Sequence, residues 1–404
     1  MPKNIQSVSD SLQCSACGAC STICAKNAIE FNWSSMGRKH AHVTDDCVDC
    51  GLCVKVCPSL DEMKLDAQYA DPYVGDIRKV YVGRSTNSDI FTNAQSGGMC
   101  TTVLSYLFDS GKIDAAVVTC MTPGITPIVE AKIVTSKEEL NTSQKSCYTP
   151  VSVLTALKQT DKYQSVAVVG LPCHIHGLTA LMKTSRKYQN ITYKLGLICD
   201  RTLCATVQES MLSLAKIKNQ EVKIEWRKKN TGYNGTKYPY QNAPVVISTV
   251  DKQVVIPNAY RFALKDFFTP PRCRRCTDKI NIHADIVFGD PWRMPDYDRE
   301  NGDSVVIVRS DLGERLISEC IENNLCNLFL RPNEQVVVGQ LIDKRRNTDL
   351  EEVERKDRLF IEREHKSKAQ IVREAVKVAT TRDRMSYKIK MKIKSIIYKI
   401  KSYI

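Results

Sequence analysis

Short apolar runs, bounded by polar or turn-forming residues, recur from residue 79 to about residue 345 and predict β-strands. Longer stretches with helical periodicity, such as TPVSVLTALKQTD (149–161), separate the first three runs. This alternation predicts an α/β core with parallel strands, whereas the closer spacing of the later runs predicts a mixed or antiparallel second half. The predicted strands are DAAVVT (114–119), SVAVVG (165–170), TYKLGLI (192–198), VKIEWRK (222–228), VVISTV (245–250), DIVFGD (285–290) and SVVIVRS (304–310).

The last part of the chain, residues 346–404, is charged, has a helical pattern and contains no cysteine. Near its end, isoleucines recur mostly every three or four residues and lysines fill most of the remaining face, which predicts a basic amphipathic helix. Two interpretations stay open for residues 386–404. This helix docks on the body or frays in solvent, or it attaches to an anionic membrane surface or an acidic partner. The isoleucines are Ile389, Ile393, Ile396, Ile397, Ile400 and Ile404.

The composition is ordinary for a soluble globular protein of 404 residues, with 43 % hydrophobic and 25 % charged residues. This length allows two or three domains. The formal net charge is +13, and residues 380–404 supply +7 of it through eight basic residues and one acidic residue. Because almost no aromatic side chains are interleaved with these lysines, we expect no nucleic-acid partner.

Eighteen cysteines are far more than a chain of this length ordinarily contains. A secreted protein would pair them as disulfides, and a cytosolic protein would use them on metal or in redox chemistry. The opening MPKNIQSVSDSLQC lacks the apolar segment of a signal peptide, and no apolar run approaches the ~18 residues of a membrane span. We therefore expect a cytoplasmic protein with metal-bound cysteines, peripheral at the inner membrane surface if the tail binds lipid.

Two cysteine runs of identical spacing, CSACGACSTIC and CVDCGLCVKVCP, lie within the first 60 residues. Both follow C-x2-C-x2-C-x3-C, the pattern of bacterial-type ferredoxins with two 4Fe–4S clusters, in which the fourth cysteine of each run binds the other cluster. One cluster is therefore predicted on Cys14, Cys17, Cys20 and Cys57. The second cluster is predicted on Cys47, Cys50, Cys53 and Cys24.

Zinc held by four thiolates is the alternative for each run, but zinc ribbons use paired C-x2-C units separated by a longer loop. Gly18 and Gly51 fit the tight turns in which backbone amides approach cluster sulfur. The chain then divides into a ferredoxin-type domain, a linker, an α/β core and a charged helical extension, which span residues 1–60, 61–78, 79–345 and 346–404.

Four further cysteines predict a third four-thiolate site. Cys173 and Cys199 each follow a predicted strand, and the carboxyl ends of strands form the ligand crevice of open α/β sheets. Cys273 and Cys276 add a C-x2-C pair. The alternative is that these cysteines are buried and inert, with zinc on the pair. The remaining cysteines are expected to be structural: Cys100, Cys120, Cys147, Cys204, Cys320 and Cys326.

Several longer motifs resemble the coenzyme F420 hydrogenase/dehydrogenase beta-subunit family, whose members include forms with a fused N-terminal ferredoxin. Besides the double ferredoxin pattern, the motifs are QSGGMCT (95–101), SCYTPV (146–151), VAVVGLPCHIHGL (166–178), LGLICD (195–200) and RCRRCTDKINIHADIVFGDPW (272–292). The resemblance implies FAD in the core beside a third 4Fe–4S cluster on the four cysteines above. It implies cofactor contacts from Ser96, Gly97, Gly98, Ser146 and Tyr148. No G-x-G-x-x-G occurs, so a Rossmann nicotinamide site is not indicated.

The chain departs from the family at Cys147, where members usually carry a lysine, so a cation is missing from the expected cofactor region. Arg272, Arg274 and Arg275 surround the C-x2-C pair. They either offset thiolate charge or contact an acidic cofactor, or they form a solvated basic loop. Asp290 and Trp292 are expected to form a turn with an aromatic anchor.

The resemblance implies an iron–sulfur flavoprotein oxidoreductase without a nucleophile–base constellation, because the cofactors carry the chemistry. A hydride carrier such as coenzyme F420 exchanges two electrons, and FAD and the clusters pass them singly to a redox partner protein or ferredoxin. Two alternatives stay open: a non-enzymatic electron-transfer subunit that serves a catalytic partner, and a flavin-dependent reductase of an organic substrate.

Overall fold

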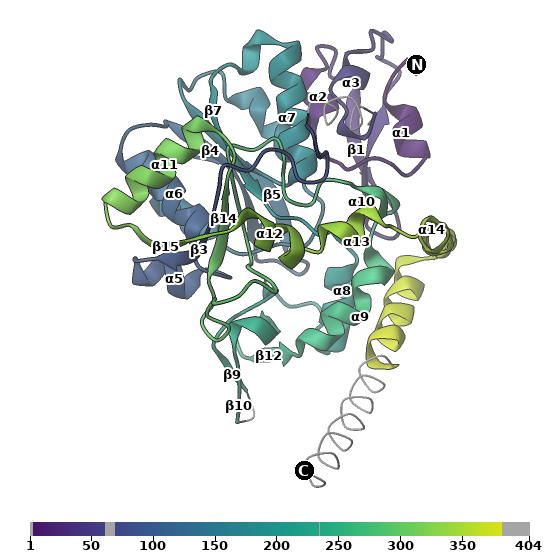
Figure 1. The fold of residues 1–404 in the computed structure, drawn as a ribbon. Helices are drawn as coiled ribbons and strands as arrows, with labels where there is room; N and C mark the ends of the chain where they lie inside the picture. Colours follow the sequence, from purple (N-terminus) through teal and green to yellow (C-terminus); the bar gives the residue numbers. More distant parts are fainter. Residues whose placement is uncertain (1–2, 61–68, 234, 382–404) are drawn as a thin grey trace.

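The computed structural model describes residues 3–60, 69–233 and 235–381 (Figure 1). The cysteine-rich module at its start is a hairpin flanked by short helices. Gly18 and Gly51 have φ angles of +100° and +73° and stand immediately before two of these helices, as their turns require. The elements are α1 (Gln6–Asp10), α2 (Ala19–Ile23), β1 (Ile29–Trp33), β2 (Lys39–Val43) and α3 (Leu52–Lys55).

An eight-stranded mixed sheet forms the centre of the molecule, in the order β15-β3-β14-β13-β7-β6-β4-β5. The four strands β13, β7, β6 and β4 are parallel, and every other pairing in the sheet is antiparallel. The predicted α/β class and mixed second half are confirmed. The strands are β3 (Lys79–Ser85), β4 (Ala115–Thr122), β5 (Ile128–Val134), β6 (Val166–Gly170), β7 (Ile191–Leu197), β13 (Ile286–Gly289), β14 (Ser304–Val308) and β15 (Cys326–Arg331).

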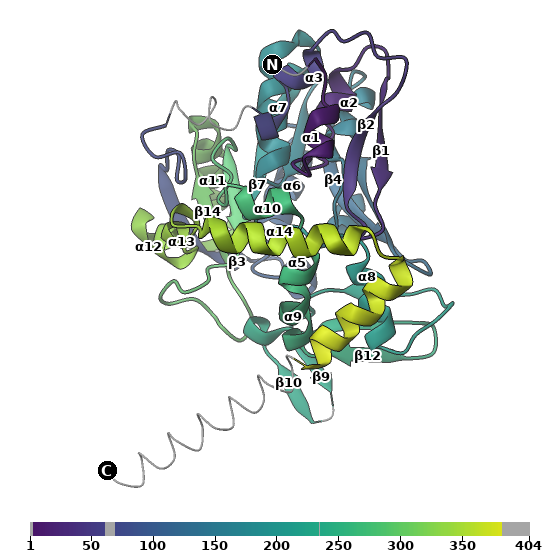
Figure 2. The same ribbon diagram turned by 90° about the vertical axis from the view of Figure 1, so that its right-hand side faces the viewer.

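Helices cover both faces of this sheet (Figures 1 and 2). Helices α6 (Met99–Asp109) and α11 (Asp311–Glu322) bury their apolar sides against one face. Helix α7 (Pro172–Thr184) and the 3₁₀ segment η2 (Val153–Gln159) cover the other face, together with Cys17 and Ala19 of the ferredoxin-type module. All five residues of β14 are buried, which explains the apolar run that follows Ser304.

Three strands of the main sheet and one helix differ from the sequence-based prediction. β3, β5 and β15 were not predicted. β5 and β15 are the two outermost strands of this sheet, and the side chains of β5 alternate between partly buried and exposed. The predicted helical stretch 149–161 forms η2 instead, because tertiary contacts capture its backbone. Leu154 N donates to Cys17 O at 3.0 Å, and Thr22 Oγ1 donates to Leu154 O at 2.7 Å.

A smaller layer packs below the main sheet. It consists of the antiparallel sheet β12-β11-β8 and the helices that pack on it, and its core includes Phe360, Ile371 and Ala375 from the C-terminal helices. Its elements are α8 (Val207–Leu214), β8 (Lys223–Glu225), β11 (Val245–Ser248), β12 (Gln253–Ile256), α9 (Asn258–Phe268), α14 (Leu350–Glu364) and a helix over 368–381, and α10 (Pro271–Arg275) contacts α14. Helices α12 (Asn333–Gly339) and α13 (Ile342–Arg346) instead bury Val336 and Ile342 in the core of the main sheet.

The remaining elements are short. They are α5 (Ser88–Asn93), η1 (Glu138–Ser143), η3 (Arg186–Tyr188), the hairpin β9 (Thr231–Tyr233) with β10 (Thr236–Tyr238), and η4 (Tyr240–Asn242). The second half of the predicted linker runs along the core, where Arg309 donates to the carbonyls of Val74 and Asp76 at 2.9 and 2.7 Å. Residues 61–68 and the predicted amphipathic helix at 386–404 lie outside the described residues. Within the described ranges, no helix combines the length and the apolar character needed to cross a membrane.

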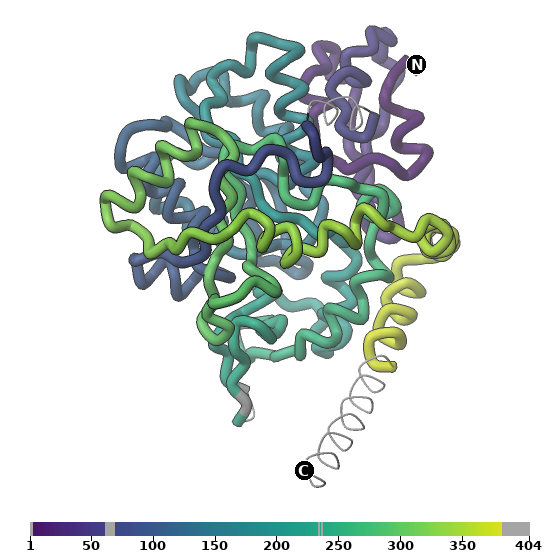
Figure 3. The backbone as a smooth tube through the Cα atoms, in the orientation of Figure 1, coloured from purple at the N-terminus to yellow at the C-terminus, as the bar shows by residue number. Residues whose placement is uncertain are grey.

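Several site segments predicted in the α/β core lie at the edge of the main sheet where its parallel strands end, and Figure 3 follows the course of the chain through the molecule. The parallel strands β6, β7 and β13 end there and lead to Cys173, Cys199 and Asp290. Because β14 is antiparallel to β13, its first residue, Ser304, lies at the same edge. The end of β3 pairs with Ser304 through Gly83, which brings the SGG motif to this edge as well.

Candidate functional site

The four cysteines assigned to the first cluster surround one small cavity in the ferredoxin-type module. Cys14, Cys17, Cys20 and Cys57 line it, together with backbone of the intervening loop and Pro58. Cys57, the last cysteine of the second run, thus shares this cavity with three cysteines of the first run. This is the crossed arrangement that the spacing predicts for two ferredoxin clusters.

Backbone amides already point at one of these sulfurs. Ala16 N and Ala41 N each donate to Cys14 Sγ at 3.4 Å. Such N–H···S contacts stabilise the negative charge of thiolates and cluster sulfur. Burial raises the pKa of Cys17 to about 11 and that of Cys57 to about 12, and neighbouring thiolates add to both shifts. Four thiolates therefore need a compensating cation here, which suits iron.

The second set of four lies nearer the surface. Burial raises the pKa of Cys53, and the charges of Cys47 and Cys50 raise it further, which places these three thiols close together. Cys47 Sγ accepts from Asp49 N at 3.5 Å, and Cys50 is exposed. Cys24 packs against the small core cluster that contains Cys53.

The third set of four comes from three segments that meet beside the sheet edge. Cys173 begins α7, Cys199 follows β7, and Cys273 and Cys276 belong to α10 and the residue after it. Burial raises the pKa of Cys173 well above its usual value, and the charges of Cys17, Cys199, Cys276 and Cys273 act in the same direction. The structure therefore brings these four thiols near one another.

Three or more His, Cys, Asp or Glu side chains placed to share a single metal ion do not occur among the described residues. A 4Fe–4S cube differs from a single ion because each thiolate binds a different iron.

The first and third sets are neighbours. Among the neighbouring thiolates, Cys17 has the largest effect on the pKa of Cys173. A Cβ added to Gly177 on α7 would lie 3.4 Å from Cys17 Sγ. Glycine at 177 therefore lets α7 approach the ferredoxin-type module closely. Arg272 and Arg274 are both buried, so the solvated-loop interpretation is wrong for both. The charge of Arg272 acts on Cys57.

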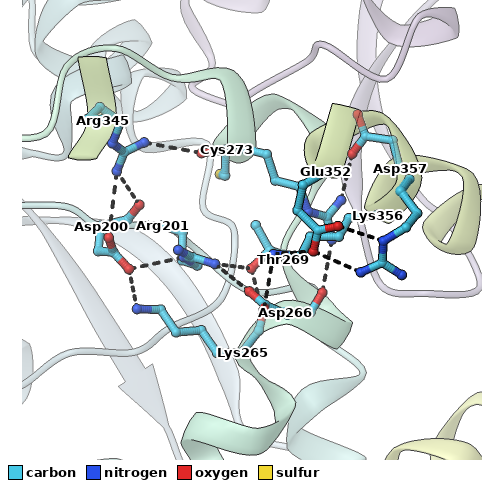
Figure 4. Close-up of polar contacts among 12 residues, drawn as sticks. Asp200, Arg201, Lys265, Asp266, Thr269, Cys273, Arg345, Glu352, Lys356 and Asp357 are labelled. Atoms are coloured by element: carbon cyan, nitrogen blue, oxygen red, sulfur yellow. Dashed lines mark hydrogen bonds and ion pairs between the residues drawn. The ribbon is translucent and has the colours of Figure 1, made fainter. Parts of the chain in front are cut away.

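A network of charged side chains lies beside the third set of cysteines, and Figure 4 shows the part of it around Asp200 and Cys273. Asp200, next to Cys199, forms ion pairs with Arg201 at 3.0 Å and with Lys265. Arg345 from α13 donates to the carbonyls of Cys276 and Asp200, each at 2.7 Å. Burial raises the pKa of Cys199, and the positive charge of Arg345 opposes that shift.

The SGG motif lies against the sheet backbone. Gly98 has φ +81° and precedes α6, and Gly97 N donates to Ser304 Oγ at 3.0 Å. A Cβ on Gly97 would lie 2.4 Å from Gly83 O and 2.5 Å from Ser304 N, so only glycine fits. Close backbone packing thus explains this glycine. Ser96 O accepts from Lys229 Nζ at 2.8 Å.

The other two predicted cofactor residues follow η1. Ser146 N donates to Gln95 Oε1 at 3.0 Å, which ties it to the residue before the SGG motif. Tyr148 packs edge-on against Trp226, with ring centroids 5.7 Å apart, and Arg261 lies over its ring at 5.1 Å. Lys145 forms an ion pair with buried Glu225, so cations do approach this region despite Cys147.

Sequence reasoning missed a buried ionic and aromatic cluster beside Tyr148. Arg227 donates to Asp290 at 2.7 and 3.4 Å, and Tyr240 OH donates to the same carboxylate at 2.5 Å. Tyr240 stacks on Trp292 at 5.4 Å with an interplanar angle of 8°. Burial alone would lower the pKa of Arg227, but Asp290 reverses the effect and the pKa lies well above its usual value. The only sequence signal for this cluster was the motif GDPW (289–292), which contains Asp290 and Trp292.

Comparison with known proteins identifies the family. Residues 80–158 match the N-terminal model and residues 163–329 the C-terminal model of "Coenzyme F420 hydrogenase/dehydrogenase, beta subunit". The chain belongs to the coenzyme F420 hydrogenase/dehydrogenase beta-subunit family. Residues 13–60 match the "4Fe-4S dicluster domain". The resemblance and the ferredoxin-type domain predicted from the sequence are thereby confirmed.

Named relatives agree with this assignment. A subunit of the F(420)H(2) dehydrogenase of Methanosarcina mazei is 25% identical over 368 residues, which cover 87% of this chain and 94% of that protein. The coenzyme F420-dependent sulfite reductase of Methanocaldococcus jannaschii is 26% identical over 334 residues, 77% of this chain but 46% of that protein. A chain of the F420-reducing nickel–iron hydrogenase complex from Methanosarcina barkeri shares the fold, with a TM-score of 0.54 and 19% identity over 70% of this chain and 94% of that chain.

We expect Gly97→Ala to destabilise this family member by about 1–3 kcal/mol, because the new methyl group would overlap two backbone atoms that cannot move away. Gly232→Ala is the matched control, since an added Cβ there meets no atom within 4 Å. Thermal unfolding of the two anaerobically purified variants and the parent protein checks this. Equal midpoints for Gly97→Ala and the parent would contradict the packing argument.

Proposed function

We propose that this chain is an iron–sulfur flavoprotein oxidoreductase that passes electrons between a hydride carrier of the coenzyme F420 type and one-electron acceptors. The observation that carries the proposal is the convergence at one sheet edge. Cys173 and Cys199 stand there at the ends of neighbouring strands, Ser304 and the SGG motif lie at the same edge, and Cys17 adjoins Cys173. Ligands bind at this edge in α/β folds.

Twelve cysteines would hold three 4Fe–4S clusters in this proposal. The crossed sets in the ferredoxin-type domain hold two, and Cys173, Cys199, Cys273 and Cys276 hold the third. Burial, amide donors and nearby arginines make these positions suitable for thiolate-bound iron. The contact between Gly177 and Cys17 would keep the first and third clusters close, and exposed Cys50 would bring the second near solvent.

FAD would be held by Ser96, Gly97, Gly98, Ser146 and Tyr148. The residues fit an anionic cofactor with a planar ring: α6 begins at this motif, and Lys229 lies beside Ser96 and over the Phe91 ring at 3.8 Å. When bound, a flavin exchanges a hydride with a coenzyme and single electrons with clusters. The chain's contribution is to orient the ring, exclude water and supply positive charge.

Metal and flavin content test the proposal. Anaerobically purified protein should contain about 12 irons and one flavin per chain. Reduced coenzyme F420 should bleach the cluster absorbance, and reduced nicotinamide should leave it unchanged. Iron without flavin, or no bleaching by reduced coenzyme F420 in flavin-loaded protein, would overturn the oxidoreductase.

A second function is an electron-transfer subunit that serves a separate catalytic partner. Two of the similar proteins are named as a subunit or belong to a complex, and exposed Cys50 suits exchange with a protein partner. This function predicts about 8 irons, no flavin and no turnover with any hydride donor. The same two assays therefore distinguish the two functions.

A further inference from the structure

The segment that follows the matched family region encloses the third cysteine set. The family models end at residue 329, and the chain continues through α12, α13 and α14. Figure 2 shows α14 lying across the molecule, and this helix contacts both α9 and α10. Helix α10 carries Cys273, so the segment packs directly against a cysteine-bearing element.

Arg345 of α13 joins the two chain segments that carry three of the four cysteines. Its side chain is only 12% exposed. One guanidinium nitrogen donates to Cys276 O at 2.7 Å. The same nitrogen donates to Cys273 O at 3.4 Å, and the other donates to Asp200 O at 2.7 Å (Figure 4). A rigid planar fork with several donors can make these three bonds at once, whereas a lysine cannot.

Asp357 of α14 fixes the same region from the other side. It is buried and accepts from Arg274 Nη1 at 2.7 Å, and it also pairs with Arg275. Both arginines lie between Cys273 and Cys276. The C-x2-C pair is therefore held through its carbonyls by α13 and through its intervening side chains by α14.

The charge of Arg345 favours an electron on the third cluster. A 4Fe–4S cube with four thiolates is negatively charged, and reduction adds one more negative charge. Arg345 also lies 3.7 Å from the Asp200 carboxylate, but Arg201, Lys265 and Lys279 share that carboxylate. The surroundings of the cysteines thus keep a positive balance, and removing one cation should make reduction harder.

We propose that Arg345 is a positioning residue for the third cluster, and that its charge raises the reduction potential of this cluster. The inference rests on the proposed function, because it requires a cluster on Cys173, Cys199, Cys273 and Cys276. It assigns a role to the segment after residue 329 that the matched family models do not cover.

Redox titration followed by electron paramagnetic resonance tests this in the full-length anaerobic protein, with dithionite as reductant. The signal that disappears in Cys199→Ala identifies the third cluster. We expect Arg345→Gln to shift the reduction equilibrium of that cluster about tenfold towards the oxidised form, which is about 59 mV for one electron. Arg345→Lys should keep the potential closer to the parent value but lower the occupancy of the cluster, because the fork is lost.

Arg346→Gln is the matched control, since it removes the same charge from the same helix. Arg346 pairs with Asp343 and Asp71, and no cysteine carbonyl is among its hydrogen-bond partners in the described part of the chain. In Arg346→Gln, the reduction equilibrium of each cluster should stay within about twofold of its value in the parent protein. If Arg345→Gln loses about four irons instead, this result supports the role of Arg345 in positioning the third cluster. The potential of Arg345→Lys, which keeps the charge, then measures the effect of that charge.

Two outcomes separate this inference from the proposed function. Parent protein with about 8 irons has no third cluster, which defeats the proposed function and this inference together. Parent protein with about 12 irons, combined with unchanged iron content and potential in Arg345→Gln, overturns only the role of Arg345.

Discussion

Cys57→Ala is expected to remove the cluster that Cys14, Cys17 and Cys20 share, although Cys57 belongs to the second cysteine run. All four thiols line one cavity, and Cys57 feels the charges of Cys17 and Cys14. Loss of one ligand exposes iron and removes binding energy that is coupled to folding. We expect the iron content to fall by about four per chain. Iron analysis and the spectrum of the reduced protein measure this.

The identity of the lost cluster is the informative result. Cys17→Ala and Cys47→Ala each define the signal of one ferredoxin-type cluster. Cys57→Ala should match Cys17→Ala, whereas ligands confined to each run would make it match Cys47→Ala. Cys320→Ala is the control, because Cys320 is buried in the core around α11 and its removal should leave iron content unchanged. A Cys57→Ala protein with full iron content would refute the crossed ligand set.

Asp290→Ala is expected to destabilise the protein by about 3–5 kcal/mol, because it leaves a buried guanidinium without its partner. The side chains of Arg227 and Asp290 are 5% and 17% exposed, and Tyr240 OH donates to the same carboxylate. Tyr148, a predicted flavin contact, adjoins this cluster through Arg227. The variant should therefore also lose flavin before it loses iron.

Thermal or urea unfolding of anaerobic protein, with flavin release followed in parallel, measures both effects. Glu300→Ala is the control, since its ion pair with Lys237 is 62% exposed on each side and such pairs contribute about 0–1 kcal/mol. Asp290→Asn, which keeps the shape but loses the charge, should fall between the parent and Asp290→Ala. If Asp290→Ala and Glu300→Ala unfolded alike, the buried cluster would have no structural importance.

Several features of this protein were predictable because short-range geometry controls them. The spacing within each cysteine run limits which thiols can reach one cube, and the observed cavity contains the predicted four. Strands β6, β7 and β13 begin and end within about one residue of their predicted bounds, because buried apolar residues make up most of each strand. The glycines before α2 and α3 adopt the left-handed conformation that their turns require.

Other features depended on contacts between distant parts of the chain. The edge strand β5 alternates in burial, so its residues lack a continuous apolar run. The stretch around Leu154 has a helical pattern but forms 3₁₀ turns, because Cys17 and Thr22 of the ferredoxin-type module take its backbone hydrogen bonds. No local rule indicates that Arg227 would meet Asp290, or that Arg345 would reach the carbonyl of Cys276.

The sequence by itself determined the family, the two-cluster module and the kinds of residues that form the sites, because those depend on side-chain chemistry and close spacing. Only the tertiary structure decided how the sites are arranged. It gathered Cys173, Cys199, Cys273 and Cys276 from three segments, placed Cys17 beside them, and buried the arginines around them. Such juxtapositions arise from the packing of whole elements, so residues far apart in the sequence become neighbours without any local signal.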